Sequence, residues 1–164
     1  MKYLKYTLVF VLVTAGIFLV GPTKKFEPAI LLDTDINTGI AGIEKYVAEK
    51  ESKVKDLKPN NQARIIWAND SLKQKTEYAV VYLHGFSASQ EEGTPIHQDF
   101  AKRYGFNLYL SRLEDHGRPD SNSFLQLTPQ NFIQSAEDAI DIGKILGDKV
   151  IVMSCSTGGT LSAI

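Results

Sequence analysis

The sequence predicts an α/β fold, a mostly parallel sheet with helices on both faces, from two observations. The segment 79–83, AVVYL, is apolar at every position, which is typical of a strand covered on both faces, as in a parallel sheet. From this segment onward, stretches of strand and helical character alternate with short connections between them. Consecutive strand, helix and strand units build a parallel sheet through right-handed crossovers.

Length and composition set the outer limits of the prediction. With 164 residues, of which 43% are hydrophobic, the chain is long enough for one globular domain with its own core. A formal net charge of -1 offers no basic stripe to neutralise a phosphate backbone, so nucleic acid is not an expected partner. Cys155 is the only cysteine, which excludes an intrachain disulfide, and no cluster of cysteine and histidine predicts a metal site.

The N-terminal segment predicts the compartment. Residues 7–20 carry no charge and follow Lys2 and Lys5, which is the arrangement of an export signal. No AxA-like cleavage site precedes Gly21, which favours an uncleaved anchor slightly, although both interpretations stay open. A buried core helix is the alternative, but core helices seldom lie at the extreme N-terminus behind lysines. We therefore expect an exported or membrane-anchored protein, with residues 1–25 as its signal peptide or membrane anchor.

Residues 26–60 are expected to form a strap followed by an amphipathic helix. Pro28 disfavours a helix in the first part of this segment. In the second part, apolar residues recur at helical spacing, namely Ile36, Ile40, Ile43, Val47 and Val54. Charged residues fill the opposite face, so we expect one face of this helix to pack on the domain and the helix to end before Pro59.

Residues 61–164 are expected to form the N-terminal portion of the α/β domain. Besides the segment 79–83, strands are expected at residues 63–68, 106–110 and 150–153. Thr128 followed by Pro129 predicts the start of a helix, and Gly147 predicts its end.

A shorter helix is expected between the second and third strands. Thr94 followed by Pro95 predicts its start, and Gly105 predicts its end. Its apolar face is expected to carry three residues, Ile96, Phe100 and Tyr104. His97 is then expected on the exposed side.

The last predicted strand leads directly into SCSTGG, residues 154–159, which resembles the nucleophile elbow written GxSxG. In that elbow the serine occupies a strained, sharp turn that lifts its hydroxyl above the sheet, so the residues two positions before and after it must be small. Gly158 meets this requirement, and Ser154 replaces the usual glycine on the other side. Ser156 is therefore the candidate nucleophile.

A second motif follows the apolar strand at 79–83. His84-Gly85-Phe86 resembles the loop that completes the oxyanion hole of the same enzymes. There, two backbone N–H groups meet the negative charge of a tetrahedral intermediate, one from this loop and one from the residue after the nucleophile. By position these donors are Phe86 and Thr157, while His84 and Gly85 support the loop.

A third motif, RLEDHG at residues 112–117, resembles the RxxGHG loop of many lipases and esterases. Asp115 stands where glycine is usual, and His116 is expected to shape the loop. The order of the three motifs, from about residue 79 onward, resembles the α/β-hydrolase superfamily, and most of all its carboxylesterases and monoglyceride-lipase-like enzymes. This resemblance implies a serine hydrolase that acts on a small-molecule ester or acyl substrate through an acyl-enzyme on Ser156, without metal or organic cofactor.

The general base is missing from this resemblance. In the superfamily the acid and then the histidine follow the serine in chain order, whereas the chain ends at Ile164, eight residues after Ser156. None of the three histidines, His84, His97 and His116, is expected to act as the base. We therefore expect an α/β-hydrolase fold truncated after the nucleophile elbow, inactive alone and with its last strand unpaired along one edge.

Two other classes of protein stay open. One is a membrane-tethered binding module that keeps the elbow shape without the catalytic triad. The other is a phosphate-binding domain, because residues 156–160, STGGT, also resemble the TGGT loop of phosphoribosyltransferases. Those loops usually follow an acidic pair, and Met153 and Ser154 stand there instead.

Overall fold

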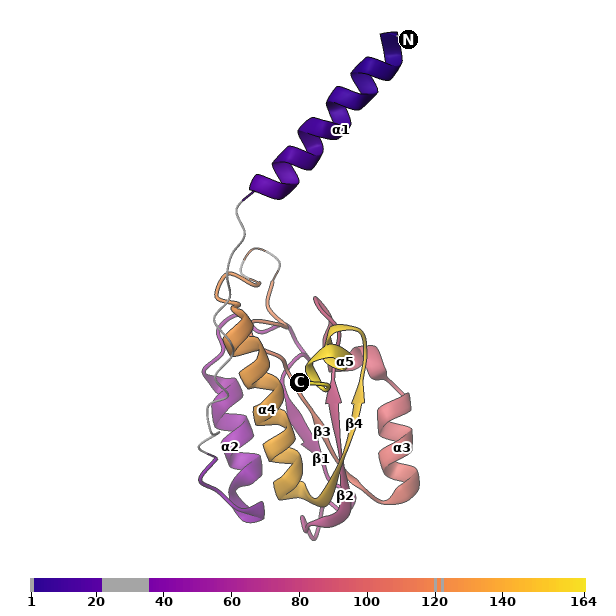
Figure 1. Cartoon of the computed structure of the whole chain (residues 1–164). Coiled ribbons are helices and arrows are strands. Elements are labelled where there is room, and N and C mark those ends of the chain that lie inside the picture. Colours follow the sequence, from indigo (N-terminus) through magenta and orange to yellow (C-terminus); the bar gives the residue numbers. More distant parts are fainter. Residues whose placement is uncertain (1, 22–35, 120, 122) are drawn as a thin grey trace.

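The computed structural model describes residues 2–21, 36–119, 121 and 123–164, and it has an α/β fold around a four-stranded sheet (Figure 1). Most of the predicted strap, residues 22–35, lies outside the described residues. The strands follow the order β1-β3-β2-β4 across the sheet. Their bounds are Arg64–Ile66 for β1, Thr76–Leu83 for β2, Asn107–Leu110 for β3 and Gly147–Ser154 for β4.

The sheet is mixed in direction. β2 runs parallel to both β3 and β4, whereas β1 pairs antiparallel with β3. The predicted parallel sheet is therefore confirmed for three strands, and the edge strand β1 is the exception. Helical crossovers set the direction of the three parallel strands, but β1 precedes the first crossover, so that rule does not apply to it.

Helices cover both faces of the sheet, as the sequence predicts. α2 (Ile40–Ser52) and α4 (Pro129–Leu146) lie on one face, and α3 (Ile96–Tyr104) lies on the other (Figure 1). Each face has its own cluster of buried apolar side chains. The central strands are therefore covered from both sides.

The continuous apolar run of β2 follows from this double cover. Ala79, Val81 and Leu83 point into the core under α2 and α4. Val80 and Tyr82 point into the core under α3. Because successive side chains of a strand alternate between the two faces of a sheet, a strand buried on both faces has no position left for a polar residue.

The helix α4 begins and ends as predicted. The Thr128 hydroxyl accepts a hydrogen bond from the Asn131 N–H at 3.2 Å, and Asn131 Oδ1 accepts one from the Thr128 N–H at 2.8 Å. This reciprocal cap satisfies two N–H groups at the start of the helix. At the other end, α4 passes directly into β4 at Gly147. A Cβ on Gly147 would stand 2.2 Å from the backbone nitrogen of Ala79, so only glycine fits there.

The helix α3 is turned relative to the prediction. His97 and Ala101 are buried, whereas Ile96 and Tyr104 are exposed. The prediction that His97 lies on the exposed side is therefore wrong. Side-chain rows that start one residue apart lie about 100° apart around a helix. The row that contains His97 is the buried one, and the His97 ring contacts Tyr82 edge-on, at 4.6 Å between centroids.

The ends of two helices also differ from the prediction. α2 begins at Ile40, later than the first residue of its predicted apolar stripe. Thr94 does not cap α3, because Pro95 precedes the helix and the Thr94 hydroxyl donates to Glu91 Oε2 at 3.3 Å instead. The predicted end is confirmed, since Gly105 closes α3 with φ +69°, in the left-handed region.

The helix α1 (Lys2–Val20) contains the apolar N-terminal segment. Its residues Tyr3–Val20 are long and apolar enough to cross a membrane, with a mean hydropathy of 2.0, and none of this window is buried inside the structure. The alternative of a buried core helix therefore has no support. A signal sequence near an N-terminus has the same length and composition, so both predicted interpretations of the segment stay open.

Candidate active site

The three motifs identified in the sequence lie at one edge of the sheet. The strands β2, β3 and β4 are parallel, so their carboxyl ends meet at the same edge (Figure 1). Residues 84–86 follow β2, residues 112–117 follow β3, and the SCSTGG segment begins at the last residue of β4. Ligand sites in open parallel sheets form at this edge.

Ser156 occupies a strained turn between β4 and the short helix α5 (Thr157–Leu161). Its backbone has φ +47° and ψ −114°, and a residue with a side chain adopts such a conformation at a cost of about 1–3 kcal/mol. Just before it, the Cys155 N–H donates to the Leu83 carbonyl at 3.1 Å, which extends the pairing of β4 with β2 up to the turn. Ser156 itself is exposed.

Gly158 and Ser154 fit beside the Ser156 turn for different reasons. A Cβ on Gly158 would stand 2.1 Å from the Leu83 carbonyl oxygen, so α5 can approach the end of β2 only with glycine at that position. Ser154 is exposed. Its side chain therefore fits where the motif usually has glycine, and this departure from the motif leaves the turn intact.

The loop after β2 lies against this turn. A Cβ on Gly85 would stand 3.5 Å from the Cβ of Ser156. Within the described part of the chain, the backbone N–H groups of Phe86 and Thr157 donate no hydrogen bond to the protein. These are the two groups that the motifs predict as oxyanion donors.

His84 is a structural residue of this loop. It is fully buried, its Nδ1 lies 2.8 Å from the Gly85 carbonyl oxygen, and its Nε2 lies 3.1 Å from the Leu113 backbone nitrogen. Since a carbonyl only accepts and a backbone N–H only donates, Nδ1 carries the proton and Nε2 is the acceptor. Burial lowers the pKa of His84 to about 4. Both ring nitrogens are thus engaged in joining the loops after β2 and β3.

His116 packs in the loop after β3. It is buried, and its Nδ1 donates to the Glu114 carbonyl at 2.8 Å. Its ring contacts Phe86 edge-on at 5.6 Å and stacks on Phe132 at 5.4 Å. Burial lowers its pKa below the ordinary value. The ring therefore packs between Phe86 and Phe132, as a loop-shaping residue.

Asp115 has a backbone conformation that favours glycine. Its φ is +57°, in the left-handed region, which glycine adopts without a steric penalty. Here the carboxylate offsets that penalty, because Oδ1 binds Arg118 Nη1 at 2.7 Å and Oδ2 accepts the Gln126 N–H at 2.9 Å.

Glu92 is a site residue that the sequence analysis missed. Its Oε2 accepts the Gly85 N–H at 2.7 Å and the Tyr82 hydroxyl at 3.3 Å. It lies in the short 3-10 helix η1 (Gln90–Gly93), after the loop it contacts. Only the path of the chain after Phe86 brings it back, and no residue spacing indicates that path.

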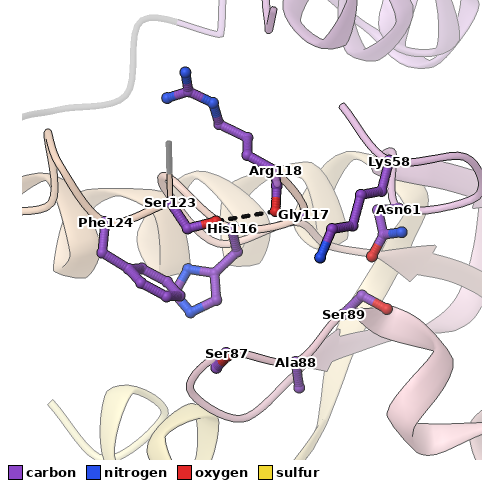
Figure 2. Close-up of a pocket in the computed structure, with 10 residues that line it drawn as sticks. All are labelled: Lys58, Asn61, Ser87, Ala88, Ser89, His116, Gly117, Arg118, Ser123 and Phe124. Atoms are coloured by element: carbon purple, nitrogen blue, oxygen red, sulfur yellow. Dashed lines mark hydrogen bonds between the residues drawn. The ribbon is translucent and has the colours of Figure 1, made fainter. Parts of the chain in front are cut away.

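A polar cavity of about 210 Å³ adjoins the loop after β2. Figure 2 shows Lys58 and Asn61 on one side of it, Ser87 and Ser89 below, and the His116 ring beside Phe124. Phe124 stacks on Phe86 at 4.6 Å. Ser156 is not among the residues that line this cavity.

None of the three histidines binds the Ser156 hydroxyl. Both ring nitrogens of His84 are engaged, His116 binds through Nδ1 alone, and His97 Nε2 donates to the Gln90 carbonyl at 2.8 Å. Among the described residues, no group of three or more histidine, cysteine, aspartate or glutamate side chains is arranged to hold a metal ion.

Neither a comparison with protein-family models nor a search of curated proteins finds a match for this chain. The fold itself defines the class, an α/β protein with an open, mixed four-stranded sheet.

Proposed function

We propose that this chain is the nucleophile-bearing part of an α/β-hydrolase that cleaves carboxylic esters through an acyl-enzyme on Ser156. The observation that carries the proposal is the backbone of Ser156, a residue with a side chain at φ +47° on a turn between a parallel strand and a helix. Strain at such a position persists only where the surrounding structure holds it, and it concentrates at functional sites. The motifs that resemble the superfamily lie around the same turn.

Each site residue has a role in this proposal. Ser156 Oγ attacks the ester carbonyl, and the resulting oxyanion accepts hydrogen bonds from the N–H groups of Phe86 and Thr157. Collapse of the intermediate breaks the ester bond and releases the alcohol, and water then hydrolyses the acyl-enzyme. Two buried side chains, His84 and His116, hold the loops.

The proton of Ser156 needs an acceptor. Both ring nitrogens of His84 are engaged, and neither His97 nor His116 binds the Ser156 hydroxyl. In this superfamily the acid and the histidine follow the serine in chain order. Under this proposal the acid and the base are therefore residues other than these three histidines.

The test is labelling of the full-length gene product with a fluorophosphonate probe. Wild type and a Ser154→Ala variant should be labelled, whereas a Ser156→Ala variant should not. Ser154 is a matched control because it is also an exposed serine, two residues away. A folded full-length protein that takes up no label would contradict the proposal and favour the binding module that lacks a triad.

We further propose that α1 holds the protein at a membrane, either until signal cleavage or permanently. A helix of 19 residues is about 28 Å long, close to the thickness of a hydrocarbon core. Alkaline carbonate extraction of membranes from expressing cells separates the cases. Retention of the intact chain in the pellet indicates an anchor, and a soluble product shortened near Gly21 indicates a cleaved signal.

A further inference from the structure

We infer that Glu92 is a positioning residue, whose carboxylate holds the Gly85 peptide of the loop after β2 beside the turn that carries Ser156. The inference rests on the proposed function, because the loop and the turn are the two parts of the proposed oxyanion site. It concerns a side chain that belongs to neither motif.

Glu92 lies near both parts. On the side of β2, Oε2 accepts the Gly85 N–H at 2.7 Å and the Tyr82 hydroxyl at 3.3 Å. A single carboxylate has about four lone-pair positions, so it can accept both donors at once. On the side of β4, the thiol of Cys155, the residue before Ser156, lies within reach of the Glu92 charge.

The room around Gly85 shows how close these parts lie. A Cβ built on Gly85 would stand 3.1 Å from Glu92 Oε1 and 3.5 Å from the Cβ of Ser156. Gly85 is therefore enclosed between the carboxylate and the serine. A Cβ at this position would press on the carboxylate and lie in ordinary contact with the serine.

The hydrogen bond to Gly85 also decides which N–H group is available for an oxyanion. With the Gly85 N–H committed to Glu92, the next group along the loop is the Phe86 N–H, which has no protein acceptor among the described residues. Glu92 thus fixes the peptide that precedes this donor. Hydrogen bonds that involve a charged acceptor are roughly twice as strong as neutral ones, which suits a contact that holds a peptide beside a strained turn.

The sole cysteine provides a probe of this geometry that does not depend on catalysis. Desolvation and then the charge of Glu92 raise the pKa of the Cys155 thiol. The other titratable groups that interact with Glu92 are Tyr82 and His84. Removal of the Glu92 charge should therefore increase the thiolate fraction of Cys155 at a given pH.

The experiment compares Glu92→Ala, Glu92→Gln and Glu91→Gln variants of the full-length protein with wild type. Glu91 is the matched control, because its carboxylate binds Arg64 at 3.2 Å. The first readout is the pH profile of Cys155 alkylation by iodoacetamide. We expect both Glu92 variants to shift its midpoint to lower pH and Glu91→Gln to leave it in place.

The second readout is the rate of fluorophosphonate labelling at Ser156. Glu92→Ala should slow it by about 10- to 100-fold, the scale of a misplacement near 1 Å. Glu92→Gln should stay within about threefold of wild type, because its amide oxygen still accepts the Gly85 N–H.

The outcomes separate the two proposals. An alkylation profile that Glu92→Gln leaves unchanged overturns the placement of Glu92 beside the turn. A shifted profile with undiminished labelling in folded Glu92→Ala overturns the positioning role. A shifted profile in a folded protein whose wild type takes up no label overturns the proposed function, and the positioning role with it, while the proximity of Glu92 to Cys155 stands.

Discussion

His84 accepts a hydrogen bond from the backbone N–H of Leu113 at 3.1 Å, across the gap between two neighbouring strand ends. The same ring donates to Gly85 at 2.8 Å. One neutral imidazole therefore joins the loop after β2 to the loop after β3. Protonation of Nε2 would replace the acceptor with a donor and break the contact to Leu113.

This contact makes the stability of the chain depend on pH. Burial lowers the pKa of His84 from its ordinary 6.5 to about 4 in the folded state. The unfolded chain therefore binds the additional proton first, and stability is lost as pH falls from about 6.5 towards 4. The loss from this residue should reach about 3 kcal/mol.

Urea denaturation of the detergent-solubilised chain across this pH range measures the effect. A His84→Gln variant cannot titrate, so its unfolding free energy should vary less steeply with pH. His116 retains its own contribution in both proteins, because burial lowers its pKa as well. If the unfolding free energy of wild type and variant changed equally with pH, His84 would not be the residue that titrates.

Substitution of two neighbouring glycines by alanine should change the stability of the chain in opposite ways. Gly158→Ala places a Cβ 2.1 Å from a backbone oxygen and should destabilise the chain by about 3 kcal/mol or more. Gly159→Ala meets only the Ser154 hydroxyl at 3.6 Å, and inside α5 it should be neutral or stabilise by up to about 1 kcal/mol. Thermal unfolding of both variants tests the contrast, and similar melting temperatures would refute it.

Release of the strain at Ser156 should stabilise the chain. Ser156→Gly removes the side chain that penalises φ +47° and should raise the unfolding free energy by about 1 kcal/mol, after the added backbone entropy of glycine. Ser156→Ala keeps a Cβ and should not gain this stability. Denaturant titrations of the two variants distinguish them, and a Ser156→Gly variant less stable than Ser156→Ala would show that the turn is unstrained.

The buried ion pair of Arg112 with Glu51 should contribute more to stability than exposed ion pairs do. Arg112 binds both carboxylate oxygens, at 2.8 and 3.1 Å, with side-chain exposures of 6% and 9%. Arg112→Leu leaves the buried Glu51 charge without its partner and should lower the unfolding free energy by about 3–5 kcal/mol. Lys45→Ala removes an exposed pair with Glu49 at 3.7 Å and should change stability by less than about 1 kcal/mol. Equal effects in denaturation would argue against this ranking.

The parts of the fold that sequence predicted are those whose cause is local. The apolar run 79–83 indicates burial on both faces, and Thr128 with Pro129 marks the start of α4. The strained turn at Ser156 follows from small residues within two positions of it.

The parts that sequence did not predict depend on distant contacts. His97 is buried because its ring packs edge-on against Tyr82 of β2. Either of two adjacent side-chain rows on α3 could have packed against the sheet. Glu92 contacts Gly85 only through the path of the intervening loop. The direction of β1 depends on its pairing with β3, which no periodicity encodes.

The direct passage from α4 into β4 at Gly147 determines how firmly the strand is held against the helix. Because no loop residues separate them, α4 holds the start of the eight-residue strand that leads to Ser156. Under the proposed function, the strand therefore fixes the nucleophile against the helix. Under the same proposal, the loops after β2 and β3 are the parts that adapt to acyl groups of different shape, around a serine that stays in place.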